Sequence, residues 1–234
     1  MESQGQPHPE FDGYADRYEE LIADPLRDRF AKSAEYFHWR KLEVLRAYLA
    51  ASGKPPGKLR WLDLGCGRGD LLRIGKAAFA MACGCDVSAE SVKYCEGVTV
   101  RVQPSDESIP FADGSFDLVT AACVYHHVAA AQRAKLTESA RAVLQPGGVF
   151  CVFEHNPRNP VTRAIVKRSP VDVNAVLLNA DETKSLLRGA GFESIAVHYY
   201  LFAPESLGRR AAGFEKWLRH IPLGGQYAAF GTRP

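Results

Sequence analysis

A glycine-rich loop in the first third of the chain constrains the fold more than any other feature. The sequence LDLGCGRGD at positions 62–70 ends a short apolar run at 59–64 and opens a helix-like stretch at 70–80. Glycine lets the backbone turn at positive φ and lets a ligand approach the main chain. A strand, a glycine loop and a helix in this order are typical of nucleotide-binding units in Rossmann-like α/β proteins.

The spacing of the glycines separates the ligand classes. Dinucleotide-binding loops run G-x-G-x-x-G, and their third glycine lets the helix N-terminus receive a pyrophosphate. Here the loop runs G-x-G-x-G, and Asp70 stands at the third position. A carboxylate there repels phosphate, whereas the acidic flanks Asp63 and Asp70 suit a positively charged ligand. The Gly-Lys-Ser/Thr ending of a phosphate-binding P-loop is also missing.

Asp86 ends the next apolar run, 21 residues after Gly65. A carboxylate at this place accepts hydrogen bonds from the ribose hydroxyls of an adenosine. Alone, the loop could be a tight turn and the acid a helix cap. Together, in this order of elements, they predict a nucleoside-binding site.

Strand-like and helix-like segments alternate through the central part of the chain. Strands are expected at 59–64, 81–87, 98–102, 116–122 and 149–153, and helices at 70–80, 88–95 and 129–144. This alternation predicts βαβ units and a Rossmann-like α/β fold with helices on both faces. Two later strands, at 195–202 and 227–232, bring the sheet to seven strands, mainly parallel with an antiparallel edge strand.

The remaining segments divide the chain as follows. Residues 1–10 are expected to be a disordered tail, and 11–234 one domain. Within it we expect an N-terminal helical cap at 11–52, a ligand-binding core at 59–154, and a lid with the C-terminal sheet edge at 155–234. Apolar positions 30, 37, 42, 45 and 49 support helix throughout 11–51. Three prolines predict irregular structure at 155–180, followed by helices at 182–189, capped by Asp181, and around 205–219.

Composition excludes several classes of protein. The net charge is +2 with mixed signs along the chain, which disfavours a nucleic-acid binder. The six cysteines form no C-x-x-C pair, so we expect buried reduced thiols and no metal site. No apolar run approaches the ~20 residues that cross a bilayer, and positions 1–9 lack the apolar segment of a signal peptide. A cytoplasmic protein is expected, with no membrane partner.

Four motifs together resemble the class I S-adenosylmethionine (SAM)-dependent methyltransferases. They are DLGCGRG at 63–69, Asp86, IPFADGSFDLV at 109–119 and LQPGG at 144–148. A further pair, EHNPRNPVTR at 154–163 and IPLGGQY at 221–227, resembles a bacterial subgroup with an EHNPxNPxT motif, found among small-molecule tailoring enzymes. The resemblance implies SAM as cofactor and S-adenosylhomocysteine as product.

The resemblance also implies which residues bind SAM. The glycine loop and the ribose-binding acid correspond to Asp63, Gly65, Cys66, Gly67, Asp86 and Val87. Asp106 matches the acid that bonds the adenine amine, with neighbouring Ser105 as the alternative. The methionine end of SAM is expected against Ala122 and Cys123. Tyr14 and Tyr18 either cover SAM from the N-terminal helix or pack as helix-face core residues.

Histidines after the fourth and fifth strands are the candidates for catalysis, because the carboxyl ends of neighbouring strands meet at one edge. Methyl transfer needs an aligned acceptor, and a base helps where the acceptor carries a proton. His126 and His155 are possible bases. Glu154 is a possible base or substrate-binding group. In relatives the second histidine of such a pair packs inward, so His127 is expected to be structural.

We therefore expect a methyltransferase, monomeric or homodimeric, that acts on an O or N atom of a small molecule in secondary-metabolite or polysaccharide biosynthesis. Three alternatives stay open. Asp70 disfavours a nicotinamide-dependent oxidoreductase. A nucleic-acid or protein methyltransferase is disfavoured because positions 122–125 lack an Asn/Asp-Pro-Pro-Tyr/Phe motif. The third alternative is a non-catalytic SAM-binding subunit.

Overall fold

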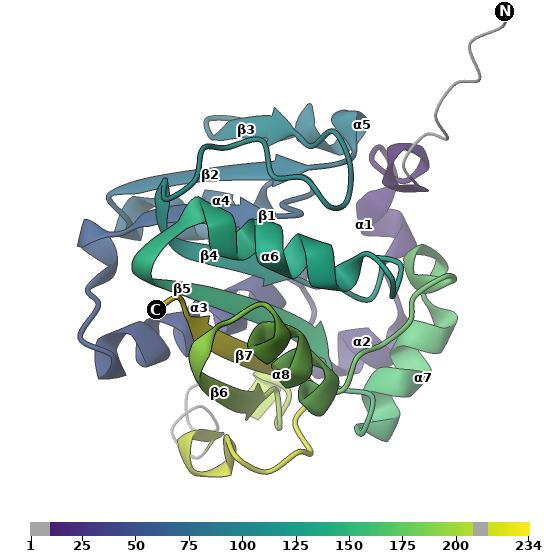
Figure 1. The fold of residues 1–234 in the computed structure, drawn as a ribbon. Coiled ribbons are helices and arrows are strands. Elements are labelled where there is room, and N and C mark those ends of the chain that lie inside the picture. The colour runs from purple at the N-terminus through teal and green to yellow at the C-terminus, as the bar shows by residue number, and fades with distance from the viewer. Residues whose placement is uncertain (1–9, 208–214) are drawn as a thin grey trace, which may run out of the picture.

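A seven-stranded sheet runs through the computed structural model, which describes residues 10–207 and 215–234 (Figure 1). The strand order is β3-β2-β1-β4-β5-β7-β6. Strands β1 to β5 run parallel to one another, whereas β7 is antiparallel to both of its neighbours, β5 and β6. The predicted Rossmann-like fold is thus confirmed. The strands are β1 (Arg60–Leu64), β2 (Met81–Asp86), β3 (Thr99–Val102), β4 (Phe116–Ala122), β5 (Leu144–His155), β6 (Glu193–Tyr200) and β7 (Gln226–Thr232).

Helices cover both faces of the sheet. In Figure 1, α6 (Arg133–Val143) and α8 (Ala180–Gly189) lie in front, and α3 (Ala34–Ala51) and α4 (Asp70–Gly75) lie behind. On α3, Leu42, Leu45 and Leu49 are fully buried at the spacing of one helix face. Because both faces are covered, the central strands consist mostly of apolar residues. The short α5 (Ala89–Val92) follows β2, and the side chain of Ser88 caps it.

Three short helices gather at the carboxyl edge of the parallel strands. They are α1 (Tyr18–Leu21), α2 (Pro25–Phe30) and α7 (Pro160–Arg168) (Figure 1). Asp24 caps α2 by accepting the backbone N–H groups of Leu26 and Arg27. The same carboxylate accepts hydrogen bonds of 2.6–3.0 Å from Arg168 at the end of α7. The segment before α2 and the end of α7, which are distant in sequence, therefore meet over the same edge of the sheet.

The N-terminal segment differs from its prediction. Instead of helix throughout 11–51, the structure has the 3-10 turn η1 (Glu10–Gly13), then α1, α2 and α3. Asp24 and Pro25 start a new helix, because an Asp cap followed by proline at the first helical position is a strong N-terminal signal. Residues 1–9 of the predicted tail lie outside the described residues.

The expectation of irregular structure at 155–180 was wrong. Residues 160–168 form α7, and η4 (Pro170–Asp172) is a 3-10 turn. Asn159 caps α7 by accepting from the N–H groups of Val161 and Thr162. A proline within a segment predicts a break in helical structure, but Pro160 occupies the first helical position, where proline favours a helix.

Other boundaries shift for similar reasons. Asn179, not Asp181, caps α8, and Glu182 completes a reciprocal capping box with it. Pro146, Gly147 and Gly148, which lie outside the strand predicted at 149–153, belong to β5, opposite a register shift between Phe116 and Leu118. Of the helix predicted around 205–219, positions 208–214 lie outside the described residues.

Within the described stretches, no helix is long and apolar enough to cross a membrane, and all six cysteines are free thiols.

The cap of α8 generates a stability prediction. Replacing Asn179 by Ala removes the acceptor for the N–H groups of Asp181 and Glu182, 2.9 and 3.1 Å away. We expect the free energy of unfolding in urea to fall by about 1 kcal/mol. The control is Ser185→Ala on the exposed side of the same helix, which should change it by less than about 0.5 kcal/mol. Equal effects of the two variants would contradict the assigned cap.

Candidate active site

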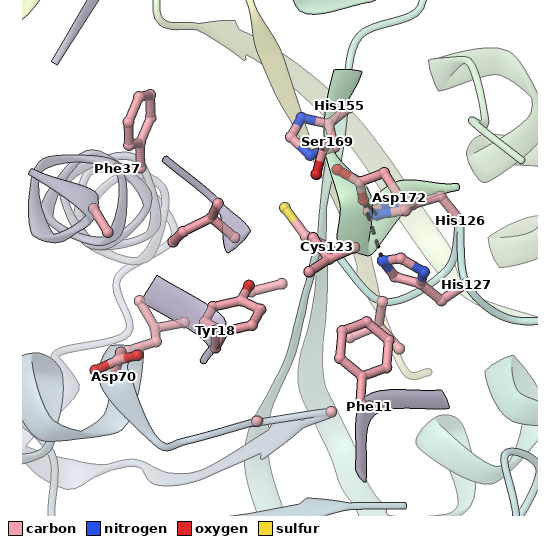
Figure 2. A pocket seen from close by; sticks show the side chains of 18 of the residues that line it. Phe11, Tyr18, Phe37, Asp70, Cys123, His126, His127, His155, Ser169 and Asp172 are labelled. Carbon is pink, nitrogen blue, oxygen red and sulfur yellow. Dashed lines mark ion pairs between the residues drawn. The ribbon is translucent and has the colours of Figure 1, made fainter. Parts of the chain in front are cut away.

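A cavity of about 1620 Å³ opens at the carboxyl edge of the sheet, beneath α1, α2 and α7. Typical small-molecule pockets measure about 300–1,000 Å³, so this one has room for a cofactor and a second molecule. Figure 2 shows Tyr18 and Asp70 on one side of it, and His126, His155 and Asp172 on the other.

The glycine loop forms one wall. Gly65 has φ +66°, and a side chain there would overlap Val124, which follows β4. Gly67 has φ +53°, and a side chain there would meet only open space. Its backbone is therefore open to a ligand. The N–H of Cys66 donates to the carbonyl of Cys85 over 3.0 Å and ties the loop to β2.

Asp86 lies beside this loop, as predicted. Its carboxylate accepts from the N–H of Gly67 at 2.7 Å and from the N–H of Ser88 at 2.8 Å. Burial raises the pKa of Asp86 above its usual value, although both hydrogen bonds oppose the shift. Val87, Ser105 and Asp106 continue the wall beyond it, so both candidates for the adenine contact line the cavity.

Asp63 closes the inner end of the loop. It accepts a hydrogen bond of 2.6 Å from Thr120, which in turn accepts one of 2.8 Å from Trp61. Burial raises the pKa of Asp63 to about 7. A carboxylate in this state binds a cationic group readily, because an opposite charge restores its ionised form.

Lys41, on α3, was missed by sequence analysis. It lines the cavity, only 4% of its surface is exposed, and no hydrogen bond or ion pair within the described parts of the chain involves it. Its charge is close enough to lower the pKa of Asp63. Buried charges are normally paired, so this ammonium indicates an anion-binding position. The sequence did carry a signal for Lys41, because this residue lies one turn before Leu45, on the inward face of α3.

His126 and Glu154 form a buried pair in the opposite wall, where His126 lines the cavity and Glu154 lies behind it. The imidazole Nδ1 lies 2.5 Å from one oxygen of Glu154, whose other oxygen accepts from the N–H of Tyr125 at 2.8 Å. Glu154 is 0% exposed and does not line the cavity. Its expected role as a base or substrate-binding group is therefore corrected: both oxygens are already engaged, and it positions His126.

The two histidines in this wall have opposite charge states. Burial favours neutral His126, but the carboxylates of Glu154 and Asp172 outweigh burial and raise its pKa well above the usual range. Burial, together with the positive charge on His126, lowers the pKa of His155 to about 4. Tyr200 donates to Oε1 of Gln226, so Nε2 of Gln226 faces Nδ1 of His155 at 3.4 Å. His155 is thus neutral, with its proton on Nε2.

His127 and Tyr14 differ from expectation. His127 lines the cavity, edge-on to Phe11 with ring centres 4.8 Å apart, whereas His126 is the histidine that packs inward. Tyr18 lines the cavity, but Tyr14 packs against Phe11 and does not. The two tyrosines share no helix face, because η1 ends before Tyr14 and α1 begins at Tyr18. Ala122 and Cys123, which were expected against the methionine end of SAM, also line the cavity.

The paired motifs at 154–163 and 221–227 contact each other. Asn156 donates to the carbonyls of Pro222 and Gly224 at 3.1 and 2.8 Å. The other two contacts run from Asn159 to the carbonyl of Leu223 and from Thr162 to that of Gly225, at 2.8 and 2.9 Å. We call these three side chains and their four carbonyls the clasp. It joins the start of α7 to the segment before β7.

Comparison with known proteins agrees with this geometry. A family model described as a methyltransferase domain matches residues 62–152. An uncharacterised methyltransferase of Synechocystis sp. is 32% identical over 174 residues, 71% of this chain and 78% of the relative. The 27-O-demethylrifamycin SV methyltransferase of Amycolatopsis mediterranei is 26% identical over 200 residues, 75% of this chain and 73% of the relative.

Among solved structures, the fold resembles a SAM-dependent methyltransferase of Thermotoga maritima described as a possible histamine N-methyltransferase. The TM-score is 0.69 at 20% identity, over 96% of this chain and 98% of that one. The chain therefore belongs to the class I methyltransferases, the enzymes that use SAM as their methyl donor.

Proposed function

We propose that this methyltransferase acts on an oxygen or nitrogen atom of a small molecule. The observation that carries the proposal is one shared cavity of about 1620 Å³, which has the glycine loop on one side and the histidines on the other. The bridge between Asp24 and Arg168 holds α2 and α7 over this edge, which suits a small acceptor better than a polymer. The rifamycin-modifying relative supports secondary-metabolite biosynthesis over polysaccharide biosynthesis as the setting.

The donor set of the first wall fits SAM. Gly67 leaves the backbone open and Asp86 offers a carboxylate to the ribose, while Asp63 and Lys41 suit the ammonium and carboxylate of the methionine end. The proposed SAM-binding residues are Asp63, Gly65, Cys66, Gly67, Asp86, Val87, Ala122, Cys123, Tyr18 and Lys41, with Asp106 or Ser105 at the adenine. When bound, SAM supplies a methyl group that moves to the acceptor atom as the carbon–sulfur bond breaks.

The residues of the opposite wall orient the acceptor in this proposal. Nδ1 of His155 accepts from Gln226, so its Nε2–H is a hydrogen-bond donor to the acceptor atom. Charged His126 and enclosed Glu154 are not free to take up a proton. Alignment by these groups lowers the barrier by fixing the acceptor in place.

A transfer assay tests the acceptor class. Methyl-labelled SAM is incubated with the protein and, separately, a low-molecular-weight metabolite extract, total tRNA or bulk protein. We expect label only in the metabolite fraction, and none with Asp86→Ala. Label in tRNA or protein contradicts the proposal, and SAM binding without transfer to any pool supports a non-catalytic subunit.

Calorimetry with two ligands tests the SAM-binding residues separately. The probes are SAM and 5′-methylthioadenosine, which lacks the amino-acid end. Asp86→Asn should weaken both by roughly 10- to 100-fold, because a hydrogen bond to a charged group contributes about 1.5–3 kcal/mol. Lys41→Met should weaken SAM by a similar factor and leave methylthioadenosine unchanged. The control is Lys58→Met, at an exposed position. Equal losses for both probes in Lys41→Met would refute its assignment.

Histidine side-chain 15N NMR tests the charge state of His155. An ordinary histidine takes up a proton near pH 6.5. We expect the imidazole of His155 to stay neutral, with hydrogen on Nε2, until the pH nears its pKa of about 4. Because the unfolded chain binds this proton first, the stability that neutral His155 contributes above pH 6.5 is lost as the pH falls towards 4. His155→Gln assigns the signal. Titration near 6.5, or a proton on Nδ1, contradicts the arrangement.

A further inference from the structure

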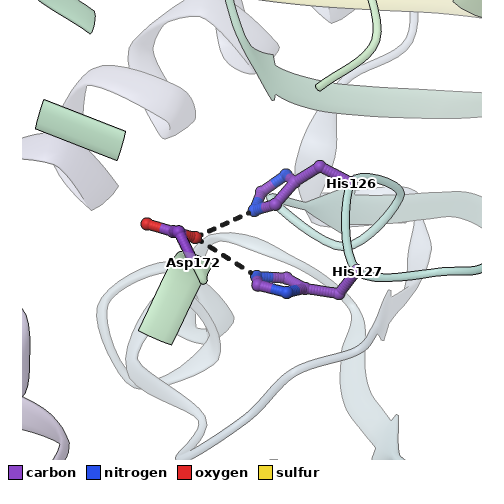
Figure 3. A group of neighbouring side chains, drawn as sticks. All are labelled: His126, His127 and Asp172. Atoms are coloured by element: carbon purple, nitrogen blue, oxygen red, sulfur yellow. Dashed lines mark ion pairs between the residues drawn. The ribbon is translucent and has the colours of Figure 1, made fainter. Parts of the chain in front are cut away.

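Three metal-ligating side chains converge at the acceptor end of the cavity. His126 and His127 follow β4, and Asp172 ends η4 (Figure 3). One oxygen of Asp172 lies 3.4 Å from Nε2 of His126 and 3.4 Å from Nε2 of His127. The three donor atoms lie within 4.8 Å of one another, and all three residues line the cavity.

The separations fit a shared ion better than direct hydrogen bonds. A hydrogen bond between a charged imidazole and a carboxylate measures about 2.7–2.9 Å. Two ligands at about 2.0–2.1 Å from a tetrahedral zinc ion lie roughly 3.3 Å apart. Both distances of 3.4 Å therefore match the edges of a coordination polyhedron.

The surroundings of His126 are those of a metal ligand. Its Nδ1 faces Glu154 at 2.5 Å, so Nε2 is the atom directed at Asp172. A carboxylate on the far nitrogen fixes the tautomer and orientation of metal-binding histidines. The carbonyl of His126 also accepts from the N–H of Val176 at 2.8 Å, which ties the histidine loop to the segment carrying Asp172. The ligands are thus held in place from two sides.

We propose that His126, His127 and Asp172 bind one divalent transition-metal ion, with an open position facing the acceptor part of the cavity. Two imidazoles and one carboxylate favour Zn²⁺, because Mg²⁺ and Ca²⁺ prefer oxygen ligands alone. On binding, the ion takes the place of any proton on Nε2 of His126, and that proton leaves to solvent. Sequence analysis expected no metal site because Asp172 lies 46 positions after His126, far outside short ligand spacings.

The open position also indicates the acceptor chemistry, a step that rests on the proposed function. None of the three predicted base candidates is free to remove a proton. A zinc ion lowers the pKa of bound water to about 7, and it lowers the pKa of a bound hydroxyl group in the same way. The acceptor would then be a hydroxyl compound whose O–H bond breaks, with the proton leaving to solvent. The electron pair kept by the oxygen forms the new bond to the methyl carbon as the carbon–sulfur bond of SAM breaks, and the sulfur keeps the electron pair of that bond.

Metal binding by the chelator-treated full chain tests the site directly. Zn²⁺ is measured by competition with a chromophoric chelator, and Co²⁺ by its visible absorption. We expect one ion per chain and a cobalt spectrum without thiolate charge-transfer bands. Asp172→Asn and His127→Gln should each weaken Zn²⁺ at least about 100-fold, and Glu154→Gln about 10- to 100-fold, as for supporting residues. The control is His220→Gln, from a histidine pair with His198 whose rings are 5.8 Å apart.

Three outcomes would overturn the proposal: no binding of either ion at one per chain, unchanged affinity in Asp172→Asn and His127→Gln, or thiolate bands that assign the ion to cysteines. SAM calorimetry on each variant verifies that it is folded. Asp86→Asn should lose SAM affinity and keep the metal. Failure of the metal site and failure of the proposed SAM site are therefore distinguishable.

Discussion

A carboxylate without solvent contact, Glu154, holds together the two strand ends on which the acceptor side of the site is built. Such a charge is stable only when it is paired and hydrogen-bonded. Glu154 ends β5, and both of its partners, the backbone N–H of Tyr125 and the imidazole of His126, follow β4. This pairing fixes the orientation of the His126 side chain. Through that side chain it also fixes the position of Asp172 relative to the loop that carries His126 and His127. The cavity wall depends on this contact.

The other buried charges of the site fall into two groups, according to whether they are closely hydrogen-bonded. Asp86 is satisfied by backbone N–H groups and Asp63 by a hydroxyl, so both also hold the loop in shape. Lys41 has no partner within the described residues, and Asp172 lies at a long distance from each histidine. The closely hydrogen-bonded charges position the walls, and in the proposals above we assign Lys41 and Asp172 to bound ligands.

Sequence reasoning reached the fold because its two strongest signals are local: the glycine loop and the alternation of strands with helices. It failed where the answer depended on contacts distant in sequence. Nothing near His126 or His127 indicates that Glu154 draws the first inward and leaves the second on the cavity wall. Lys41 and Asp172 join the site only through tertiary packing. The missed helix α7 was a local error, since Asn159 and Pro160 together are a start signal.

The clasp has a consequence for how the enzyme matures on the ribosome. Its side chains belong to residues 156–162, but their carbonyl partners belong to 222–225, and β7 must then insert between β5 and β6. The glycine loop and the five parallel strands β1 to β5 can pair earlier, as translation proceeds. The wall carrying His155 gains its support only after residue 232 has left the exit tunnel. A nascent chain could thus form its nucleoside pocket well before it can transfer a methyl group.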